Sequence, residues 1–386
     1  MKAGWQIKSL GEVLEKTETV NPHQSPDTEF DYIDVSSVSN TTFEVEQTQR
    51  LKGKDAPSRA RKLVKTNDVI FATIRPTLRR IAIVPPHLNR QVCSTGYFVL
   101  RPKAVLDHRF MYYWLFAEEF MEQMEALQKG ASYPAVTDKE VRDQVIPFPP
   151  LPEQQRIVTL LDEAFDGIAA AKANAEKNLQ NARAIFESHL QSVFTQRGDG
   201  WMDRRLGSVC ELVNGRAYKQ DEMLTSGKYP LLRVGNFFTN KTWYHSDLEL
   251  EPKKYCDNGD LLYAWSASFG PRIWDGGKVI YHYHIWKVLP NDAFVEKQFL
   301  LHLLEWDVEQ IKQVHGTGTT MMHVSKGSME ARVVPIPPLE DQAKIVAQLD
   351  DLAAETQRLE SIYQQKLNAL DELKKSLLHR AFNGDL

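Results

Sequence analysis

Two stretches of the chain repeat apolar residues at alternating intervals of three and four positions. The first stretch runs from Ile157 to Val193, and the second runs from Ile345 to Ala381. Such spacing places the apolar residues on one face of an α-helix, and a face this long needs a partner helix to cover it. Prolines precede both stretches and none interrupts them, with Gly167 as the one weak point. The pattern therefore predicts two long helices, over 151–197 and 339–386.

A sixteen-residue segment at the start of each helix occurs twice. Residues 147–162 read PFPPLPEQQRIVTLLD and residues 335–350 read PIPPLEDQAKIVAQLD, with nine identities at an offset of 188. Similar openings lie upstream, Trp5 with Leu10-Gly11 and Trp201 with Leu206-Gly207. A period this long indicates a duplicated domain pair and not a solenoid. We expect the two helices to pack antiparallel with approximate two-fold symmetry, and the alternative is that each helix docks only on its own domain.

The segments outside the two helices, 1–150 and 198–338, have a mixed pattern. Short β-like runs over 68–74, 97–100 and 260–265 alternate with Gly, Pro and Asn turn signals. Helical patterns follow over 110–127 and 296–314. We therefore expect an α+β (mixed α/β) fold, in which two globular domains are joined by two long antiparallel coiled-coil helices.

The composition is that of an ordinary globular protein, with 42% hydrophobic and 25% charged residues. No apolar run reaches the length of a membrane span, and the first residues lack the apolar stretch of a secretory signal. The three cysteines (Cys93, Cys210 and Cys256) have no metal-like spacing and are expected to be free thiols in a reducing compartment. These features predict a cytoplasmic protein without a membrane partner.

The net charge of −4 gives no overall argument for nucleic-acid binding, but the charges are unevenly distributed. Between Arg50 and Arg90 the chain carries eleven Lys or Arg residues against two Asp residues. The second domain has no equivalent, because residues 201–335 hold sixteen acidic and sixteen basic side chains. A dense basic segment is suited to contact phosphates, and the alternative is an ordinary solvated face.

Motifs for catalysis are missing from the sequence. We find no phosphate-binding Gly-x-x-x-x-Gly-Lys loop, no dinucleotide motif, no amino-methyltransferase motif and no nuclease signature. His282 and His284 alternate as strand residues do and have no third ligand nearby, which favours packing over a metal site. We therefore expect a protein that is not an enzyme and that binds no metal or cofactor of its own.

Side chains of the kinds that contact DNA are nevertheless frequent. Arg and Asn pair with base edges, whereas Ser, Thr and Lys hold phosphates. The loop 316–320 aligns with 129–132 at the repeat offset and is suited to hold phosphates, although a plain tight turn explains it equally well. The candidate DNA-binding residues are Arg59, Arg61, Arg75, Arg79, Arg80, Lys129, Ser132, Tyr133, Arg216, Tyr218, Lys219, Arg233, Asn236, Ser266, Ser268, Arg272, Thr319 and Thr320.

The repeated P-L-x-x-Q-x-x-I-V motif after a proline-rich lead, with the Ala-Phe-Asn-Gly-Asp-Leu ending, resembles the specificity subunits of type I restriction-modification systems. The resemblance implies that 1–150 and 198–338 are target-recognition domains, each reading one half of a bipartite, asymmetric sequence in double-stranded DNA. It also implies that the helices dock two modification subunits, which bring S-adenosylmethionine and methylate adenine at N6. Restriction subunits would join with ATP and Mg. The docking residues expected on the helices are Gln154, Ile157, Leu161, Gln342, Ile345 and Leu349.

Three other functions are compatible with parts of this sequence. One is a coiled-coil scaffold that does not read DNA sequence, against which the basic segment and the repeated loops argue. Another is a stand-alone enzyme, which the missing motifs disfavour. The third is a specificity subunit that serves a fused nuclease-methyltransferase.

Overall fold

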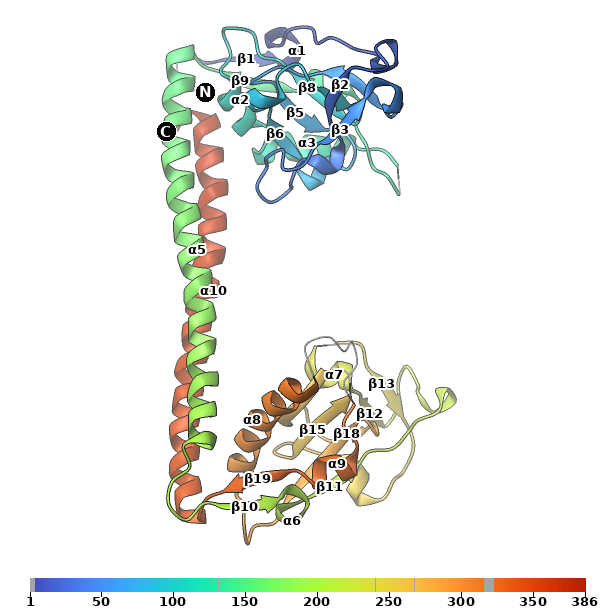
Figure 1. The fold of residues 1–386 in the computed structure, drawn as a ribbon, viewed down its shortest axis with the longest axis vertical. Coiled ribbons are helices and arrows are strands. Elements are labelled where there is room, and N and C mark those ends of the chain that lie inside the picture. Colours follow the sequence, from blue (N-terminus) through green and yellow to red (C-terminus); the bar gives the residue numbers. More distant parts are fainter. Residues whose placement is uncertain (1–3, 131, 240, 267, 316–322) are drawn as a thin grey trace. The chain divides into compact units, whose positions relative to one another are not determined.

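The computed structural model describes residues 4–130, 132–239, 241–266, 268–315 and 323–386 (Figure 1). These residues form two compact units. Unit 1 comprises the chain up to Glu176 together with Gln364–Leu386, and unit 2 comprises Lys177–Tyr363. The boundaries lie within the two long helices and not at residues 150 and 338, because the ends of these helices pack into the cores of the globular domains.

Two sheets form the body of unit 1, in addition to a two-stranded ribbon. The four-stranded sheet has the order β3-β2-β7-β4, with β2 parallel to β7. The three-stranded sheet has the antiparallel order β6-β5-β8. The strand bounds are β2 Glu29–Ile33, β3 Gln49–Lys52, β4 Ala60–Leu63, β5 Val69–Ala72, β6 Ile81–Ile83, β7 Val92–Ser94 and β8 Tyr97–Leu100.

The central strand β5 is buried on both faces, which explains its uninterrupted apolar sequence Val-Ile-Phe-Ala. Val69 and Phe71 belong to a core that helices α2 (His108–Trp114) and α3 (Glu118–Leu127) complete. Ile70 and Ala72 point to a second core on the opposite side of the sheet. The predicted helical pattern over 110–127 is thus two helices, because Ala117 adopts an extended conformation and begins a new helix.

Unit 2 repeats this topology with one additional strand, β11, in its second sheet. Its sheets have the orders β13-β12-β17-β14, with β12 parallel to β17, and β11-β18-β15-β16. The helix α8 (Lys297–His315) packs along β16. The other bounds are β11 Cys210–Asn214, β12 Tyr229–Leu232, β13 Tyr244–Ser246, β14 Tyr255–Cys256, β15 Leu261–Ser266, β16 Ser268–Ile273, β17 Val279–Tyr281, β18 Ile285–Pro290 and α7 Val234–Phe238.

Short ribbons close both globular domains with the same register. In unit 1, β1 (Gln6–Ser9) pairs antiparallel with β9 (Val145–Phe148), and in unit 2, β10 (Met202–Arg205) pairs with β19 (Val333–Ile336). Gln6 lies opposite Phe148, as Met202 lies opposite Ile336, so the repeat holds at the level of single residues. The short helices beside the ribbons are α1 Leu10–Val13, α4 Asp138–Arg142, α6 Leu206–Val209 and α9 Lys326–Glu330.

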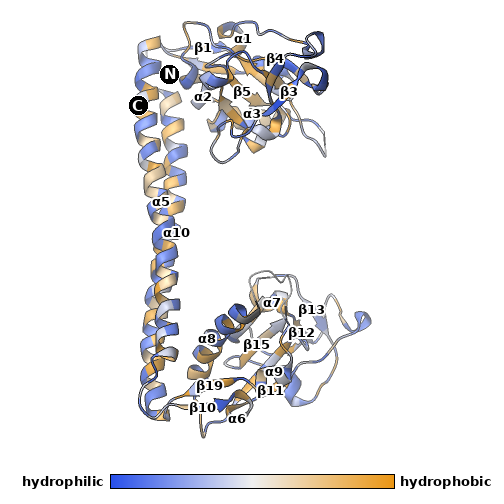
Figure 2. Ribbon diagram, in the orientation of Figure 1, coloured by the Kyte–Doolittle hydropathy of each residue, from blue (hydrophilic) through white to orange (hydrophobic). Residues whose placement is uncertain are grey.

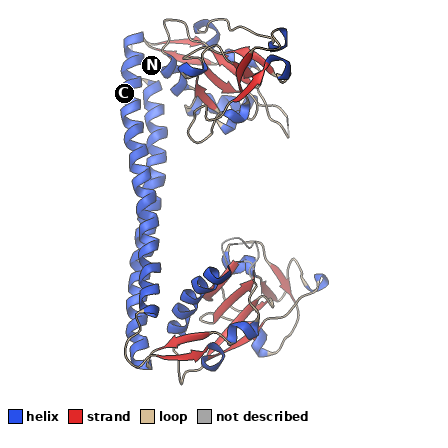
Figure 3. Ribbon diagram, viewed as in Figure 1, coloured by secondary structure: helices blue, strands red, loops and turns tan. Residues whose placement is uncertain are grey.

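Several 3-10 helices connect the strands. They are η1 Pro22–Gln24, η2 Val35–Ser37, η3 Gly53–Asp55, η4 Pro76–Leu78, η5 Pro86–Leu88, η6 Gln220–Glu222 and η7 Pro252–Lys254. Figure 3 shows that the strands are confined to the globular domains, whereas the two long helices run without interruption.

The long helices are α5 (Leu151–Thr195) and α10 (Leu339–Asn383), each of 45 residues. They begin at the residues that the sequence predicted and end two and three residues earlier. Hydrophobic and hydrophilic residues alternate along both (Figure 2). The helices are antiparallel in each unit: Lys172 pairs with Asp371 in unit 1, and Arg183 pairs with Glu360 in unit 2. The predicted fold class is confirmed.

The end of each long helix completes a core of a globular domain. In unit 1, the Phe382 ring lies 5.1 Å from both Phe110 and Trp114, measured between ring centroids. In unit 2, Phe194 stands at the equivalent position of the repeat and stacks on Trp306 at 5.2 Å. Both phenylalanines are buried, so each helix end is fixed to a globular domain.

All three cysteines are buried and free. Burial raises the pKa of the Cys93 and Cys210 thiols to about 12, and it also raises the pKa of Cys256. The thiols are therefore protonated at neutral pH and behave as small apolar side chains. Within the described ranges, no helix combines the length and the apolar character that crossing a membrane requires.

Candidate nucleic-acid interface

In unit 1, two loops lie side by side at one edge of the β6-β5-β8 sheet. The first follows β5 and contains η4, and the second is a hairpin closed by a bridge between Lys129 and Ala135. Ile74 forms a bridge with Ala135, and the backbone N–H of Arg75 donates to the carbonyl of Pro134 at 2.7 Å. The loops are therefore held together by backbone hydrogen bonds and not by side chains alone.

Arg75 and Tyr133 form the most prominent exposed pair on these loops. The guanidinium carbon of Arg75 lies 5.1 Å from the centroid of the Tyr133 ring, and Nη2 donates to the carbonyl of Ser132 at 3.3 Å. The Tyr133 side chain is 72% exposed. Arg75 and Arg79 flank η4 with φ angles of 49° and 52°, a conformation that is costly for residues with a Cβ. The loop thus presents two arginines in a fixed, strained backbone.

The remaining candidates of unit 1 differ in their surroundings. Arg59 is exposed, and its carbonyl accepts from Thr95 N. Lys129 pairs with Glu140 at 3.1 Å, and hydrogen bonds from Thr137, with Lys129 next, lower the pKa of Glu140 to about 2. Two other candidates have partners within the fold, since Arg61 donates to Asn21 Oδ1 and Arg80 to the carbonyl of Val38.

Other members of the basic segment 50–90 are also paired with acids. Arg50 contacts Glu29 and Asp31, Lys62 contacts Asp138, and Lys65 contacts Glu18. Because these charges are neutralised locally, the segment is not one continuous phosphate-facing surface. Among the candidates in the described part of unit 1, Arg59, Arg75 and Arg79 are exposed, and Arg75 and Arg79 lie on the first of the two loops.

Unit 2 presents a different set of side chains at the equivalent edge. Ser266 forms a bridge with His323, as Ile74 does with Ala135 in unit 1. Rings gather beside this bridge: Trp265 lies 4.9 Å from His284 and 5.9 Å from His323 between centroids. His282 lies 4.8 Å from His284. The equivalent positions in unit 1, at the offset of 188, are Ser94 and Gly96, so imidazole rings replace small residues here.

A pocket of about 330 Å³ opens next to these rings. Arg233, Asn236, Tyr244, His282 and His284 line it, with Val234, Gly235 and Thr242. Arg233 lies over the Tyr244 ring at 5.5 Å, and Asn236 Nδ2 donates to the carbonyl of Thr242 at 2.7 Å. Burial, then His284 and Arg233, lowers the pKa of His282 to about 4. Burial, His323 and Arg233 also lower the pKa of His284.

Both histidines are therefore neutral at pH 7, so each ring offers one donor and one acceptor nitrogen. The pocket therefore combines two neutral imidazoles with the Asn236 amide and the Arg233 guanidinium. This mixture of donors and acceptors matches the edges of bases better than the uniform negative charge of phosphates. No three His, Cys, Asp or Glu side chains are grouped as metal ligands in the part of the chain that the structure describes.

From the sequence, only packing and metal binding were considered for His282 and His284. The expected strand alternation is wrong, because Tyr283 and His284 lie in a turn after β17, where the Tyr283 ring is 4.5 Å from His282 and 3.9 Å from His284 between centroids.

The other candidates of unit 2 are less available. Arg216 makes a bidentate contact with Glu222, at 2.9 and 2.7 Å, and lies 5.1 Å from the Tyr218 ring. Arg272 donates to the carbonyl of Phe237 and pairs with Asp275. Lys219 is exposed, whereas Ser266 is buried. Thr319 and Thr320 lie outside the described residues, and so does the side chain of Ser268.

The six expected docking residues form internal contacts instead. Gln154 and Gln342 have no exposed surface, and Ile157, Leu161 and Leu349 are at most 1% exposed. The expectation that these five contact another subunit is corrected, because a side chain without exposed surface has none to offer. The sixth residue, Ile345, is partly buried against the unit 2 core.

The two glutamines instead tie each long helix to its globular domain. Gln154 Oε1 accepts from Asp107 N at 2.8 Å, and Nε2 donates to the carbonyls of Val105 and Pro149 at 3.1 and 2.8 Å. Gln342 repeats this arrangement with Glu296 N and the carbonyls of Phe294 and Pro337. The glutamine of the repeated motif is thus a buried connector.

A second connector lies eight residues, or about two turns, further along each helix. Asp162 pairs with Arg109 at 2.6 Å and accepts from the Tyr113 hydroxyl. Its counterpart Asp350 contacts His302 Nε2 at 2.9 Å. Burial lowers the pKa of His302, but Glu305 and Asp350 outweigh it and the pKa is raised. The connector of unit 2 is therefore titratable.

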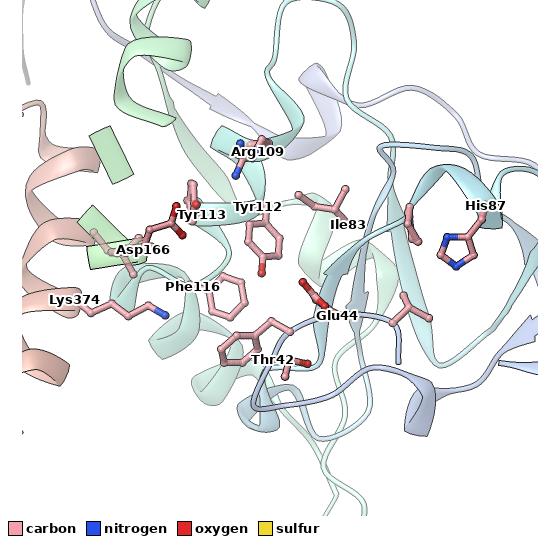
Figure 4. Close-up of a pocket in the computed structure, with 15 residues that line it drawn as sticks. Thr42, Glu44, Ile83, His87, Arg109, Tyr112, Tyr113, Phe116, Asp166 and Lys374 are labelled. Carbon is pink, nitrogen blue, oxygen red and sulfur yellow. The ribbon is translucent and has the colours of Figure 1, made fainter. Parts of the chain in front are cut away.

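A cleft of about 580 Å³ in unit 1 lies between the loop 42–45, α2 and the long helices. Figure 4 shows Lys374 reaching toward Phe116, with Asp166 beside Lys374 and Arg109 farther away, above Tyr112. The Lys374 ammonium lies 4.9 Å from the Phe165 ring, and burial, with Lys172 next, lowers its pKa. No candidate DNA-binding residue lines this cleft. The loop edges of the two units, where Arg75 and Asn236 lie, therefore remain the candidate interface.

Comparison with known proteins gives a consistent result. The chain matches the family model described as type I restriction modification DNA specificity domain twice, over residues 2–180 and 198–369. It is 24% identical to the EcoKI specificity subunit of Escherichia coli K12 over 327 residues, which cover 76% of this chain and 69% of the relative. It is 23% identical to the EcoBI specificity subunit of Escherichia coli over 189 residues, which cover 49% of this chain and only 40% of that relative.

Two solved structures resemble the whole chain. One, from work on complex assembly and conformational transition of the type I R-M system, has a TM-score of 0.90 at 29% identity and covers 100% of this chain and 99% of its own. The other is the HsdS subunit from Thermoanaerobacter tengcongensis, with a TM-score of 0.69 at 28% identity, covering 100% and 98%.

Proposed function

The chain belongs to the family of type I restriction modification DNA specificity domains, and from this we propose that its two globular domains read the two halves of a bipartite, asymmetric DNA target. We further propose that two modification subunits dock on the chain and methylate adenine with their own S-adenosylmethionine. Restriction subunits that use ATP and Mg complete the assembly. The chain itself selects the site.

One observation carries this proposal: the two units share a framework but differ at one edge. The ribbon registers are the same in both, and the strand orders correspond except for β11, which adds a fourth strand to the second sheet of unit 2. At the loop edge, unit 1 presents Arg75 stacked on Tyr133, whereas unit 2 presents His282 and His284 beside Asn236. A common frame with different donor and acceptor groups is what two readers of different half-sites require.

The side chains at the two edges suggest different kinds of contact. Arg75 is a permanent cation whose fork matches the two acceptors of guanine or a phosphate. The neutral imidazoles of His282 and His284 have no charge for phosphates and therefore suit base edges. Half or more of protein–DNA hydrogen bonds go to the sugar-phosphate backbone of the DNA. In unit 2, many of the phosphate contacts are therefore made by other groups or by the partner subunits.

The test is methylome sequencing of a host in which the chain works with its modification subunits. We expect Arg75→Ala to weaken methylation by about 5- to 150-fold, which corresponds to the 1–3 kcal/mol of one good base contact. His282→Ala should relax the other half of the same target. Arg50→Ala is the matched control, because Arg50 lies in the same basic segment but pairs with Glu29 and Asp31.

A binding assay distinguishes the proposed function from that of a scaffold protein that does not read DNA sequence. A purified complex that binds a random duplex as tightly as one with the methylated site would support the scaffold. If Arg75→Ala and His282→Ala altered the same half-site, independent reading by the two units would be refuted.

A further inference from the structure

Two ion pairs join α5 to α10, one in each unit. In unit 1, Lys172 Nζ contacts Asp371 Oδ1, and in unit 2, Arg183 Nε contacts Glu360 Oε1 at 3.0 Å. All four side chains are partly exposed, between 32% and 59%. They flank the apolar stripe, where charged residues decide which helices pair and in which register.

The two ion pairs are related by the internal repeat, but their charges are exchanged. Lys172 and Glu360 are equivalent residues at the offset of 188, and so are Arg183 and Asp371. Where α5 carries a base, the repeated position of α10 carries an acid. Both cations of the two pairs therefore belong to α5, and both anions belong to α10.

This arrangement distinguishes the α5–α10 pair from pairs of identical helices. Two α5 helices in the same antiparallel register would place Lys172 opposite Arg183. Two α10 helices would place Asp371 opposite Glu360. Like charges at such positions destabilise a helix pair about as much as opposite charges stabilise it, so both homotypic pairs lose the attraction and gain repulsion.

The apolar stripe has the same asymmetry. Ala175 and Ala182 on α5 are buried, at 1% and 3% exposure. Their repeat equivalents on α10 are Tyr363 and Leu370. The two stripes therefore differ in side-chain volume at these positions, so two identical helices would not pack in the same way as α5 and α10.

We propose that α5 and α10 form a heterotypic interaction surface, which accepts the opposite helix of this chain or of a second copy and rejects an identical helix. Such a device prevents mispairing between two helices that begin with the same repeated motif, at 151–162 and 339–350. The proposal concerns helix pairing alone and is tested without DNA, so it stands or fails independently of the proposed function.

The experiment uses three variants of the full chain. The acidic variant carries Lys172→Glu and Arg183→Glu, the basic variant carries Glu360→Lys and Asp371→Lys, and the exchanged variant carries all four substitutions. The first two imitate the charges of homotypic pairs, and the exchanged variant restores opposite charges in reversed order. Lys177→Glu is the control for a changed charge on α5, since this exposed lysine makes no ion pair within the described residues.

Urea unfolding at low salt is measured first. We expect the acidic and basic variants to lose about tenfold in the folding equilibrium constant, which equals about 1.4 kcal/mol, and the exchanged variant to regain it. The difference should shrink in 1 M NaCl, where the Debye length is about 3 Å. If the exchanged variant were no more stable than the acidic and basic ones, the proposal would be refuted, whatever the oligomeric state.

Native mass spectrometry then tests partner choice between chains. When the acidic and basic variants are produced together, acidic–basic dimers should exceed either homodimer by about tenfold. Dimers of all three kinds in statistical proportion at low salt would contradict heterotypic pairing. If every variant stays monomeric, the unfolding comparison alone decides.

Discussion

Replacing Gln154 by leucine should detach the first long helix from its globular domain. The side chain is fully buried and makes three hydrogen bonds, one from Asp107 N and two to the carbonyls of Val105 and Pro149. Leucine has a similar volume but leaves these three backbone groups without partners. Each buried group that is left unsatisfied costs about 1–3 kcal/mol, so we expect unit 1 to lose about 3 kcal/mol or more.

Urea unfolding monitored by hydrogen exchange measures this loss separately in each unit. Peptides that contain α2 should lose protection in Gln154→Leu, whereas peptides from unit 2 should not change. Gln155→Leu is the matched control, because Gln155 is the next residue of the same helix and is exposed. Surface substitutions of this kind change stability by about 0.5 kcal/mol or less.

The repeat provides an internal replicate. Gln342→Leu should destabilise unit 2 in the same way, with the exposed Gln348 as the control position. If Gln154→Leu cost no more than Gln155→Leu, the buried amide would not be the connector between helix and domain. Equal loss of protection in both units would also refute the reasoning, since the contacts of Gln154 are confined to unit 1.

Four further outcomes are expected. Phe382→Ala should destabilise unit 1 by about 3–5 kcal/mol, as buried phenylalanines do, and unchanged exchange in α2 would contradict its place in the core. Because the pKa of His302 is raised, the protonated imidazole stabilises the folded state fully below about pH 6.5, and this stabilisation is lost as the pH rises through the pKa of the folded state. The difference in unfolding free energy between the unchanged chain and His302→Gln, measured by urea unfolding, should therefore be larger at pH 6 than at pH 9. Exchanging residues 1–150 for the domain of a relative should change one half of the methylated sequence, and a change in both halves would count against separate reading. The purified chain alone should transfer no labelled methyl group to DNA, and labelled product would contradict this.

The long helices and the duplication were predictable because they depend on local and periodic signals. The three-four spacing of apolar residues marks a helix wherever it occurs, and the starts at Leu151 and Leu339 follow directly from the prolines before them. The short strands could be placed for the same reason, since the runs 97–100 and 260–265 coincide with β8 and nearly with β15.

The candidate site was less predictable because it is assembled from distant segments. Glutamine is usually a surface residue, but Gln154 and Gln342 are buried because their amides pair with backbone groups such as the carbonyls of Val105 and Phe294, about 50 residues upstream. The basic segment looked free in sequence because its acidic partners, such as Glu18 and Asp138, lie outside it. The pocket in unit 2 combines a loop after β12 with the turn after β17, which no single window contains.

During translation, the two units complete their cores at different times. Phe194 leaves the ribosome before Phe299 and Trp306, so the aromatic ring from α5 is already present when unit 2 folds around it. Phe110 and Trp114 of unit 1 must wait for Phe382, which is synthesised about 270 residues later. At about 5–20 residues per second, this delay is roughly 15–50 seconds. A chain released before Phe382 is synthesised therefore leaves Phe110 and Trp114, in the domain made first, without the ring that covers them.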